Sequence, residues 1–193
     1  MRKLLLMAVL ATATVGACTT RGTEETAVRR GDEAFAMGNY DEALAEYRLA
    51  VRQGAEDPLV VARVAHTYAT MGRVDDAGDF YEEAASKDPG LVDQAVSDLM
   101  YLARDAQSTD DRFAMATAVE TALRLRAGIG VGTMSLPLAR HYFENGEYGR
   151  ALPFYQKAMA EATDSAPEIV FEVGNAYEEI GDCQHALIYF ERF

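Results

Sequence analysis

Residues 58–91 read PLVVARVAHTYATMGRVDDAGDFYEEAASKDPGL, a stretch with the signals of two helices joined by a turn. Small and apolar residues lie on one helical face up to Gly72, and a second amphipathic run follows it. Glycine readily adopts the left-handed conformation that ends a helix, so Gly72 predicts the turn. Asp57-Pro58 and Asp88-Pro89 suit the cap and first turn of a new helix. The stretch is therefore predicted to be a helical hairpin.

The same hairpin pattern recurs along the chain. Alanine, an aromatic residue and a further residue follow each turn glycine at spacings of five, four and three: Gly38, Ala43, Tyr47 and Ala50; Gly72, Ala77, Tyr81 and Ala84; Gly146, Ala151, Tyr155 and Ala158; Gly181, Ala186, Phe190 and Phe193. Seven residues before each glycine stands a small residue, which lets two helices approach closely: Gly31, Ala65, Ala139 and Gly174. Because such a hairpin buries its apolar face only against its neighbours, the pattern predicts a stacked array.

This pattern resembles the tetratricopeptide repeat family, most clearly in residues 58–91. The resemblance implies an all-α fold, a tetratricopeptide-like α-solenoid of antiparallel helical hairpins wound as a right-handed superhelix. Repeats would occupy residues 26–126, and two more, the last incomplete, would occupy residues 135–193. The alternative is an unrelated helical bundle.

The middle of the chain departs from the pattern. Gly72 and Gly146 lie 74 residues apart, six more than two repeats, so one irregular unit is expected between them. We expect a degenerate hairpin at residues 92–126 that lacks the family's small and aromatic residues. Residues 127–134, AGIGVGTM, are predicted to be a Gly-rich linker that acts as a hinge. Pro153 should kink the following second helix or delay its start.

The N-terminus has the layout of an export signal. Arg2 and Lys3 precede an apolar run at residues 4–17, which is shorter than the roughly 20 residues that span a bilayer. Val15-Gly16-Ala17-Cys18 resembles the lipobox of bacterial lipoproteins. That resemblance implies a signal peptide at residues 1–17, lipid attachment at Cys18 and a tether at residues 18–25.

The protein would then be a membrane lipoprotein facing the periplasm. Thr19 follows the cysteine in place of the Asp that marks inner-membrane retention, which favours the outer membrane. The alternative is an ordinary cleaved signal with an incidental cysteine.

Composition and residue placement favour binding over catalysis. The formal net charge of −13 argues against nucleic acid as a partner, because phosphate binding depends on cationic groups. His66, His141 and His185 fall in three different repeats without partners at ligand spacing, so we expect no metal site and no cofactor. The remaining cysteine, Cys183, is interpreted as a packed thiol. No catalytic constellation is recognisable, and we expect no enzyme activity.

A binding groove is implied by the family resemblance. In tetratricopeptide arrays the first helix of each hairpin lines a groove, and residues beside the small packing positions point into it. The matching residues, with neighbours on the same helical face, are Asp32, Phe35, Arg63, His66, Arg140, Phe143, Phe171 and Asn175. Aromatic anchors with polar groups suit a peptide or helix of a partner protein.

These observations predict a membrane-anchored scaffold that binds proteins of the bacterial cell envelope. Two other functions stay open. The chain could be the targeting arm of an enzyme whose catalytic domain lies beyond Phe193. It could also be a structural protein that self-associates through an uncapped C-terminal end, where Ile188, Tyr189 and Phe190 lack a covering helix.

Overall fold

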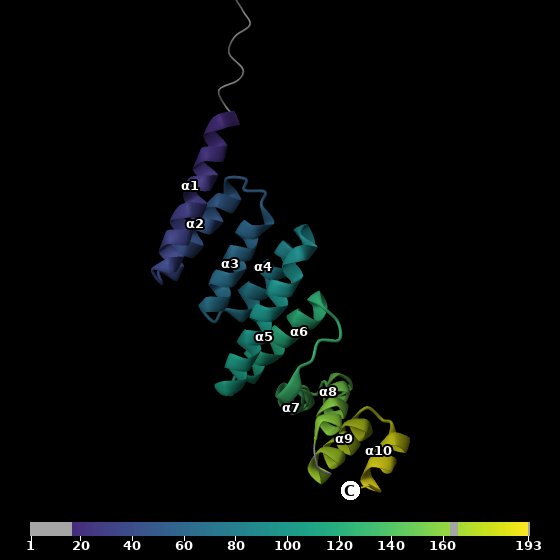
Figure 1. The fold of residues 1–193 in the computed structure, drawn as a ribbon. Coiled ribbons are helices and arrows are strands. Elements are labelled where there is room, and N and C mark those ends of the chain that lie inside the picture. The colour runs from purple at the N-terminus through teal and green to yellow at the C-terminus, as the bar shows by residue number, and fades with distance from the viewer. Residues whose placement is uncertain (1–16, 163–165, 193) are drawn as a thin grey trace, which may run out of the picture.

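The computed structural model describes residues 17–162 and 166–192. Within these ranges it contains ten α-helices, two short 3-10 helices and no strand (Figure 1). The α-helices are α1 (Ala17–Ala36), α2 (Tyr40–Arg52), α3 (Pro58–Thr70), α4 (Val74–Lys87), α5 (Val92–Ser108), α6 (Arg112–Leu125), α7 (Ser135–Glu144), α8 (Tyr148–Glu161), α9 (Pro167–Glu179) and α10 (Cys183–Phe190). The 3-10 helices are η1 (Pro89–Leu91) and η2 (Gly132–Met134).

The helices form five antiparallel hairpins stacked along one direction, from α1–α2 to α9–α10 (Figure 1). Each hairpin packs most closely within itself and then against its neighbour in the chain. This arrangement confirms the prediction of an all-α array of helical hairpins. We call α1, α3, α5, α7 and α9 the first helices, and their partners the second helices.

The turn inside each hairpin explains the repeated glycine. Gly72 has a φ of +71°, in the left-handed region that favours glycine. The amide of Arg73 then donates to the carbonyl of Tyr68 over 3.0 Å. Turns with the same hydrogen bond and a positive φ close the hairpins at Gly38, Gly146 and Gly181.

The third hairpin has the same turn without a glycine. Asp110 adopts a φ of +56°, and the amide of Asp111 donates to the carbonyl of Ala106 over 2.9 Å. Ala103, seven residues before Asp110, is fully buried. The expectation that this unit lacks the small packing residue was therefore wrong. It arose because Asp tolerates the left-handed conformation, so no glycine marks the turn.

Small residues before the turns allow close helix contact. A Cβ atom built on Gly31 would lie 2.5 Å from Cε1 of Tyr47, and one on Gly174 would lie 2.5 Å from Cε1 of Phe190. Neither ring could keep its position beside a larger residue, so these glycines set the helix separation in the first and last hairpins.

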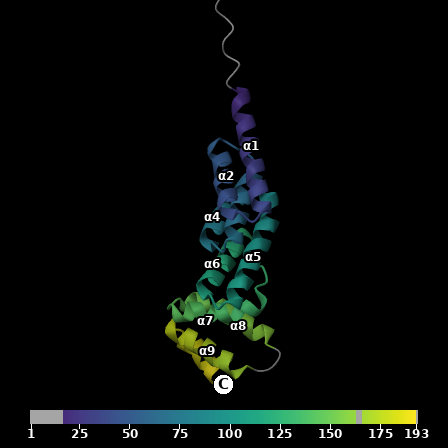
Figure 2. The same cartoon turned by 90° about the vertical axis from the view of Figure 1, so that its left-hand side faces the viewer.

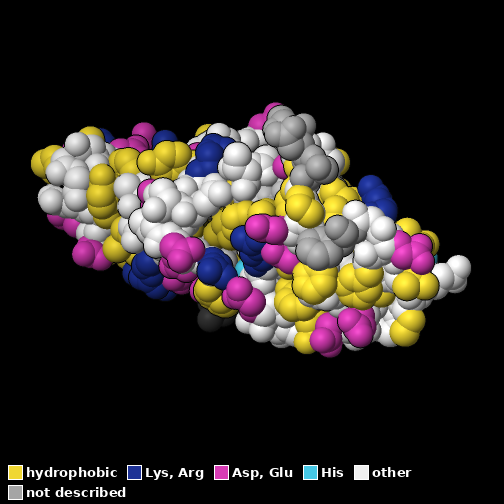
Figure 3. Space-filling view, turned by 90° about the horizontal axis from the view of Figure 1, so that it is seen from below, with side chains coloured by type: hydrophobic (Ala, Val, Ile, Leu, Met, Phe, Trp, Pro, Cys, Tyr) yellow, Lys and Arg dark blue, Asp and Glu magenta, His cyan; other side chains and the backbone are white. Residues whose placement is uncertain are grey.

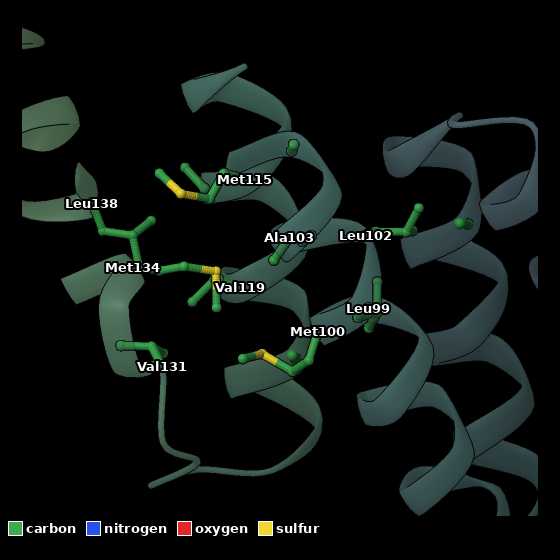
Figure 4. Packing of buried hydrophobic residues seen from close by; sticks show 14 of the residues in the cluster. Leu99, Met100, Leu102, Ala103, Met115, Val119, Val131, Met134 and Leu138 are labelled. Atoms are coloured by element: carbon green, nitrogen blue, oxygen red, sulfur yellow. The ribbon is translucent and has the colours of Figure 1, made fainter. Parts of the chain in front are cut away.

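Residues 127–134 connect α6 to α7, and helix direction changes there. In Figure 2, α7, α8 and α9 lie across the direction followed by α1–α6. Val131 and Met134 are buried in the same core as Met115 and Val119 of α6 (Figure 4). The Lys157 ammonium also donates to the carbonyl of Ile129 over 3.3 Å. The linker is thus anchored by its apolar side chains, and the hinge stays a prediction.

Pro153 does not delay the start of its helix. α8 begins at Tyr148, at the usual distance from the turn glycine, and continues through the proline. The expectation of a late start was wrong because Pro153 is exposed and removes only one amide donor from the second turn.

The predicted signal peptide, residues 1–17, lies outside the described residues except at Ala17. The backbone of the predicted tether, residues 18–25, belongs to α1, while the side chain of Cys18 lies outside the described part of the structure. Among the helices as described, none combines the length and apolar character needed to cross a membrane.

Candidate functional site

Three networks of a tyrosine, a carboxylate and a cation lie where neighbouring first helices meet. In the first network, the Tyr47 hydroxyl donates to Oδ1 of Asp32 over 2.7 Å. Nε of Arg63, on the next first helix, lies 3.3 Å from the same oxygen. A buried tyrosine of a second helix and an arginine of α3 thus converge on one carboxylate of α1.

The second network joins α3 to α5. Nδ1 of His66 lies 3.0 Å from Oδ2 of Asp98, and the Tyr81 hydroxyl donates to that same oxygen.

The third network joins α7 to α9. Arg140 binds Glu172 in a bidentate manner, with Nη2 at 2.7 Å from Oε1 and Nε at 3.1 Å from Oε2. Burial, followed by the nearby Glu172 carboxylate, raises the pKa of Tyr155. All three networks share one design, because each links a hairpin to the next through a carboxylate.

In the second network, burial and hydrogen bonding shift the pKa values of Tyr81, Asp98 and His66. Burial, followed by the hydrogen bond to Asp98, raises the pKa of Tyr81, so its hydroxyl remains a donor. Burial alone would raise the pKa of Asp98, but the hydrogen bonds from His66 and Tyr81 outweigh it and lower that pKa. The hydrogen bond to Asp98 raises the pKa of His66, which favours its cationic form.

Two surface hollows lie beside the second and third networks. The front hollow, between α3 and α5, has a volume of about 390 Å³. The back hollow, between α7 and α9, has a volume of about 300 Å³. The front hollow is lined by His66, Ala69, Thr70, Met71, Gly72, Asp98, Tyr101, Leu102 and Asp105. The back hollow is lined by Arg140, Phe143, Glu144, Tyr155, Glu172 and Asn175.

The two hollows occupy equivalent places in the repeat. His66, Ala69 and Thr70 stand six, three and two residues before Gly72, as Arg140, Phe143 and Glu144 do before Gly146. The back hollow therefore has an arginine and a phenylalanine where the front hollow has a histidine and an alanine. The front hollow, with the smaller side chains at these positions, has the larger volume.

The structure divides the predicted groove residues into two groups and one residue that lies apart from both. Asp32, Phe35, Arg63 and His66 lie together, with the rings of Phe35 and His66 5.4 Å apart. Arg140, Phe143 and Asn175 line the back hollow. Phe171 lies elsewhere, with its ring centre 5.7 Å from that of Phe190 on α10.

The sequence reasoning missed Asp98, Tyr101, Asp105, Glu172 and the two network tyrosines Tyr81 and Tyr155. Glu172 could have been found, since it stands nine residues before Gly181, as Arg63 does before Gly72. The residues of α5 could not be aligned in this way while the turn at Asp110 was unrecognised.

The side chains of the two hollows can contact a partner through charged, polar and aromatic groups. The charged side chains of the hollows are paired, apart from Asp105, for which the described chain holds no hydrogen-bond or ion-pair partner. The described residues include no group of three or more His, Cys, Asp or Glu placed to hold a metal ion. Cys183, expected to be a packed thiol, is exposed and unbridged because it begins α10 at the edge of the array.

Comparison with known proteins agrees with this architecture. A family model described as tetratricopeptide repeat matches residues 28–92 and 116–193, most of the chain. The chain belongs to the tetratricopeptide repeat family. The unmatched residues 93–115 of this tetratricopeptide protein hold nearly all of α5 and the first turn of α6, in the hairpin that turns at Asp110. No curated protein matches the sequence.

Several solved structures are similar to most of the chain at low sequence identity. A crystal structure of MamA protein shares 20% identity at a TM-score of 0.45, covering 89% of this chain and 90% of that one. TTC0263, a thermophilic tetratricopeptide protein of Thermus thermophilus, shares 22% identity at a TM-score of 0.39, covering 88% and 89%. MamA from Desulfovibrio magneticus RS-1 shares 13% identity at a TM-score of 0.42, covering 88% and 92%.

Proposed function

We propose that this protein is a non-catalytic scaffold of the bacterial cell envelope, which binds a peptide or helix of a partner protein along its first helices. The observation that carries the proposal is the pair of hollows at equivalent repeat positions. A partner segment lying across the first helices could place side chains in both.

Exposed side chains beside the hollows support a binding role. Tyr101 is 66% exposed and lines the front hollow, although it belongs to a helix whose opposite face is deeply buried. Aromatic side chains contribute much of the binding energy in protein interfaces because they bury a large area at a small entropic cost. An aromatic ring left in solvent beside a hollow is therefore suited to contact a partner.

The envelope location rests on the N-terminal pattern. The charged start, the apolar run and the cysteine after Ala17 support export and lipid attachment at Cys18. More than one acyl chain gives stable membrane anchoring, at about 0.8 kcal/mol for each buried methylene. We propose that the scaffold faces the periplasm from the outer membrane.

A crosslinking pull-down from native membranes tests the scaffold. Tyr101→Ala and Asn175→Ala should each reduce recovery of a specific envelope protein by about tenfold if those side chains contact it. Phe113→Ala is the matched control, because Phe113 is also 66% exposed but lies on the second helix α6. Equal recovery with all three variants would exclude the hollows as the binding site. Release of the Cys18→Ala variant from the membrane fraction tests the anchor separately.

Self-association is a second candidate function, favoured by the surface of the last hairpin. Leu187 and Ile188 are 58% and 47% exposed on α10, and Figure 3 shows hydrophobic side chains gathered over this part of the molecule. Light scattering should then show a mass that rises with concentration and falls in Leu187→Asp. A constant monomer mass would remove this candidate. An enzyme with this array as its targeting arm would require a longer reading frame, which sequencing of the gene would reveal.

A further inference from the structure

We propose that the front hollow binds an arginine side chain of the partner protein, held between the carboxylate of Asp105 and the ring of Tyr101. This inference rests on the proposed scaffold function and names the chemistry that its partner must present.

The charge of the front hollow is unbalanced. Its charged and titratable side chains are His66, Asp98, Tyr101 and Asp105, and it contains no lysine or arginine. Asp98 is engaged by His66 and Tyr81, whereas the Asp105 carboxylate has no hydrogen-bond or ion-pair partner within the described chain. Arg104 is adjacent in sequence but does not line the hollow. A partner cation would therefore meet one free carboxylate and no cation other than His66.

The surfaces of the front hollow match the two parts of an arginine side chain. Ala69, Met71 and Leu102 provide an apolar wall for its methylene groups. The exposed ring of Tyr101 offers a flat face on which a guanidinium can stack. A lone carboxylate on a polar surface would provide neither the apolar wall nor the aromatic face. The hollow is therefore more specific for arginine than an acidic patch would be.

The back hollow contains its own arginine. There the Arg140 guanidinium binds Glu172 beside Tyr155 and Phe143, so a cation, a carboxylate and aromatic rings meet in one hollow. At the equivalent position of the front hollow, His66 is shorter and its contact with Asp98 leaves Asp105 free. The partner's arginine would thus bring to the front hollow a guanidinium, the group that Arg140 provides in the back hollow.

The test compares N-acetylarginine amide with N-acetylcitrulline amide, which has the same shape without the charge. Ligand-observed NMR on the full chain in detergent measures both dissociation constants. We expect citrulline to bind about tenfold more weakly, because charge-assisted hydrogen bonds contribute more than neutral ones. Asp105→Asn and Tyr101→Leu should each weaken arginine binding by about three- to tenfold.

Asp79→Asn is the matched control. Asp79 is exposed on α4 outside the hollow, so its replacement removes the same charge and should leave arginine binding unchanged. Equal binding of arginine and citrulline, equal losses in Asp79→Asn and Asp105→Asn, or no measurable binding would overturn the inference. Capture of an envelope partner that depends on Asn175 but survives both Asp105→Asn and Tyr101→Leu would overturn it while leaving the proposed function in place.

Discussion

The front and back hollows are built at the same repeat positions and differ in what occupies them. In the back hollow, Arg140 binds Glu172 and the ring of Phe143 contacts that of Tyr155. In the front hollow, His66 and Ala69 take the equivalent positions, and within the described chain neither the Tyr101 ring nor the Asp105 carboxylate takes part in a hydrogen bond, ion pair or ring contact.

Equivalent repeat positions thus serve stability in the back hollow and binding in the front hollow. In the back hollow, Arg140 joins α7 to Glu172 of α9 and Phe143 packs against α8, so both contribute to stability. Residues around the front hollow leave space and exposed groups, which suits binding. A solenoid can use equivalent positions in these two ways because each hairpin contacts only its neighbours. A less stable interface between two hairpins can then be offset by more stable interfaces elsewhere in the array.

The largest expected contrast is in stability. Phe143→Ala should lower the free energy of unfolding by about 2 kcal/mol, because a half-buried ring packed against Tyr148 and Tyr155 is lost. Tyr101→Ala should change it by less than about 0.5 kcal/mol, since that ring is mostly exposed. Urea unfolding followed by circular dichroism at 222 nm measures both values. A similar loss of unfolding free energy in the two variants would contradict the assignment of stability to the back hollow and binding to the front hollow.

The second contrast is in arginine binding. Ala69→Phe should place a ring in the front hollow as Phe143 does in the back one, and should weaken binding of N-acetylarginine amide by about tenfold, or 1.4 kcal/mol. The same NMR titration measures this change. Thr70→Ser, which keeps the size and polarity of a neighbouring residue, should bind normally. Full binding by Ala69→Phe would show that the ligand lies outside the hollow.

A third, smaller contrast concerns the tyrosines of the two networks. Tyr81→Phe should lower the free energy of unfolding by about 1 kcal/mol, because Asp98 then retains only the hydrogen bond from His66. Tyr155→Phe should cost about half as much, since Glu172 keeps two bonds from Arg140. Urea unfolding at neutral pH provides the comparison, and the reverse order of costs would count against it.

The smallest expected effect is pH dependence confined to the front hollow. The pKa of His66 is raised in the folded protein, so its contact with Asp98 contributes fully below about pH 6.5, the unfolded value, and is lost as pH rises through the folded pKa. Because the pair is partly exposed, the contribution should stay below about 1 kcal/mol. The stability difference between wild type and His66→Arg, measured by urea unfolding from about pH 6 to pH 9, should therefore change with pH. A constant difference would show that His66 does not titrate in this range.

Much of the fold could be predicted from short-range pattern. The glycine and alanine positions predicted four of the five hairpins, since a turn needs a left-handed residue and a close helix contact needs a small one. The third hairpin was only partly predicted, because Asp110 takes the conformation for which glycine was the expected marker. The site was predicted less well. Asp32, His66, Arg140 and Asn175 were placed by their register, but their carboxylate partners were not identified.

Local patterns were enough to predict four helical hairpins and their repeat, because turns and helix ends depend on residues close in the chain. The folded structure was needed to show that Asp98 and Glu172 pair with cations one repeat away, and that Tyr101 and Asp105 lie beside a hollow. It also decided that Val131 and Met134 anchor the Gly-rich linker. These features depend on how neighbouring first helices are spaced, which is set by side-chain packing across the repeats and not by any local spacing in the chain.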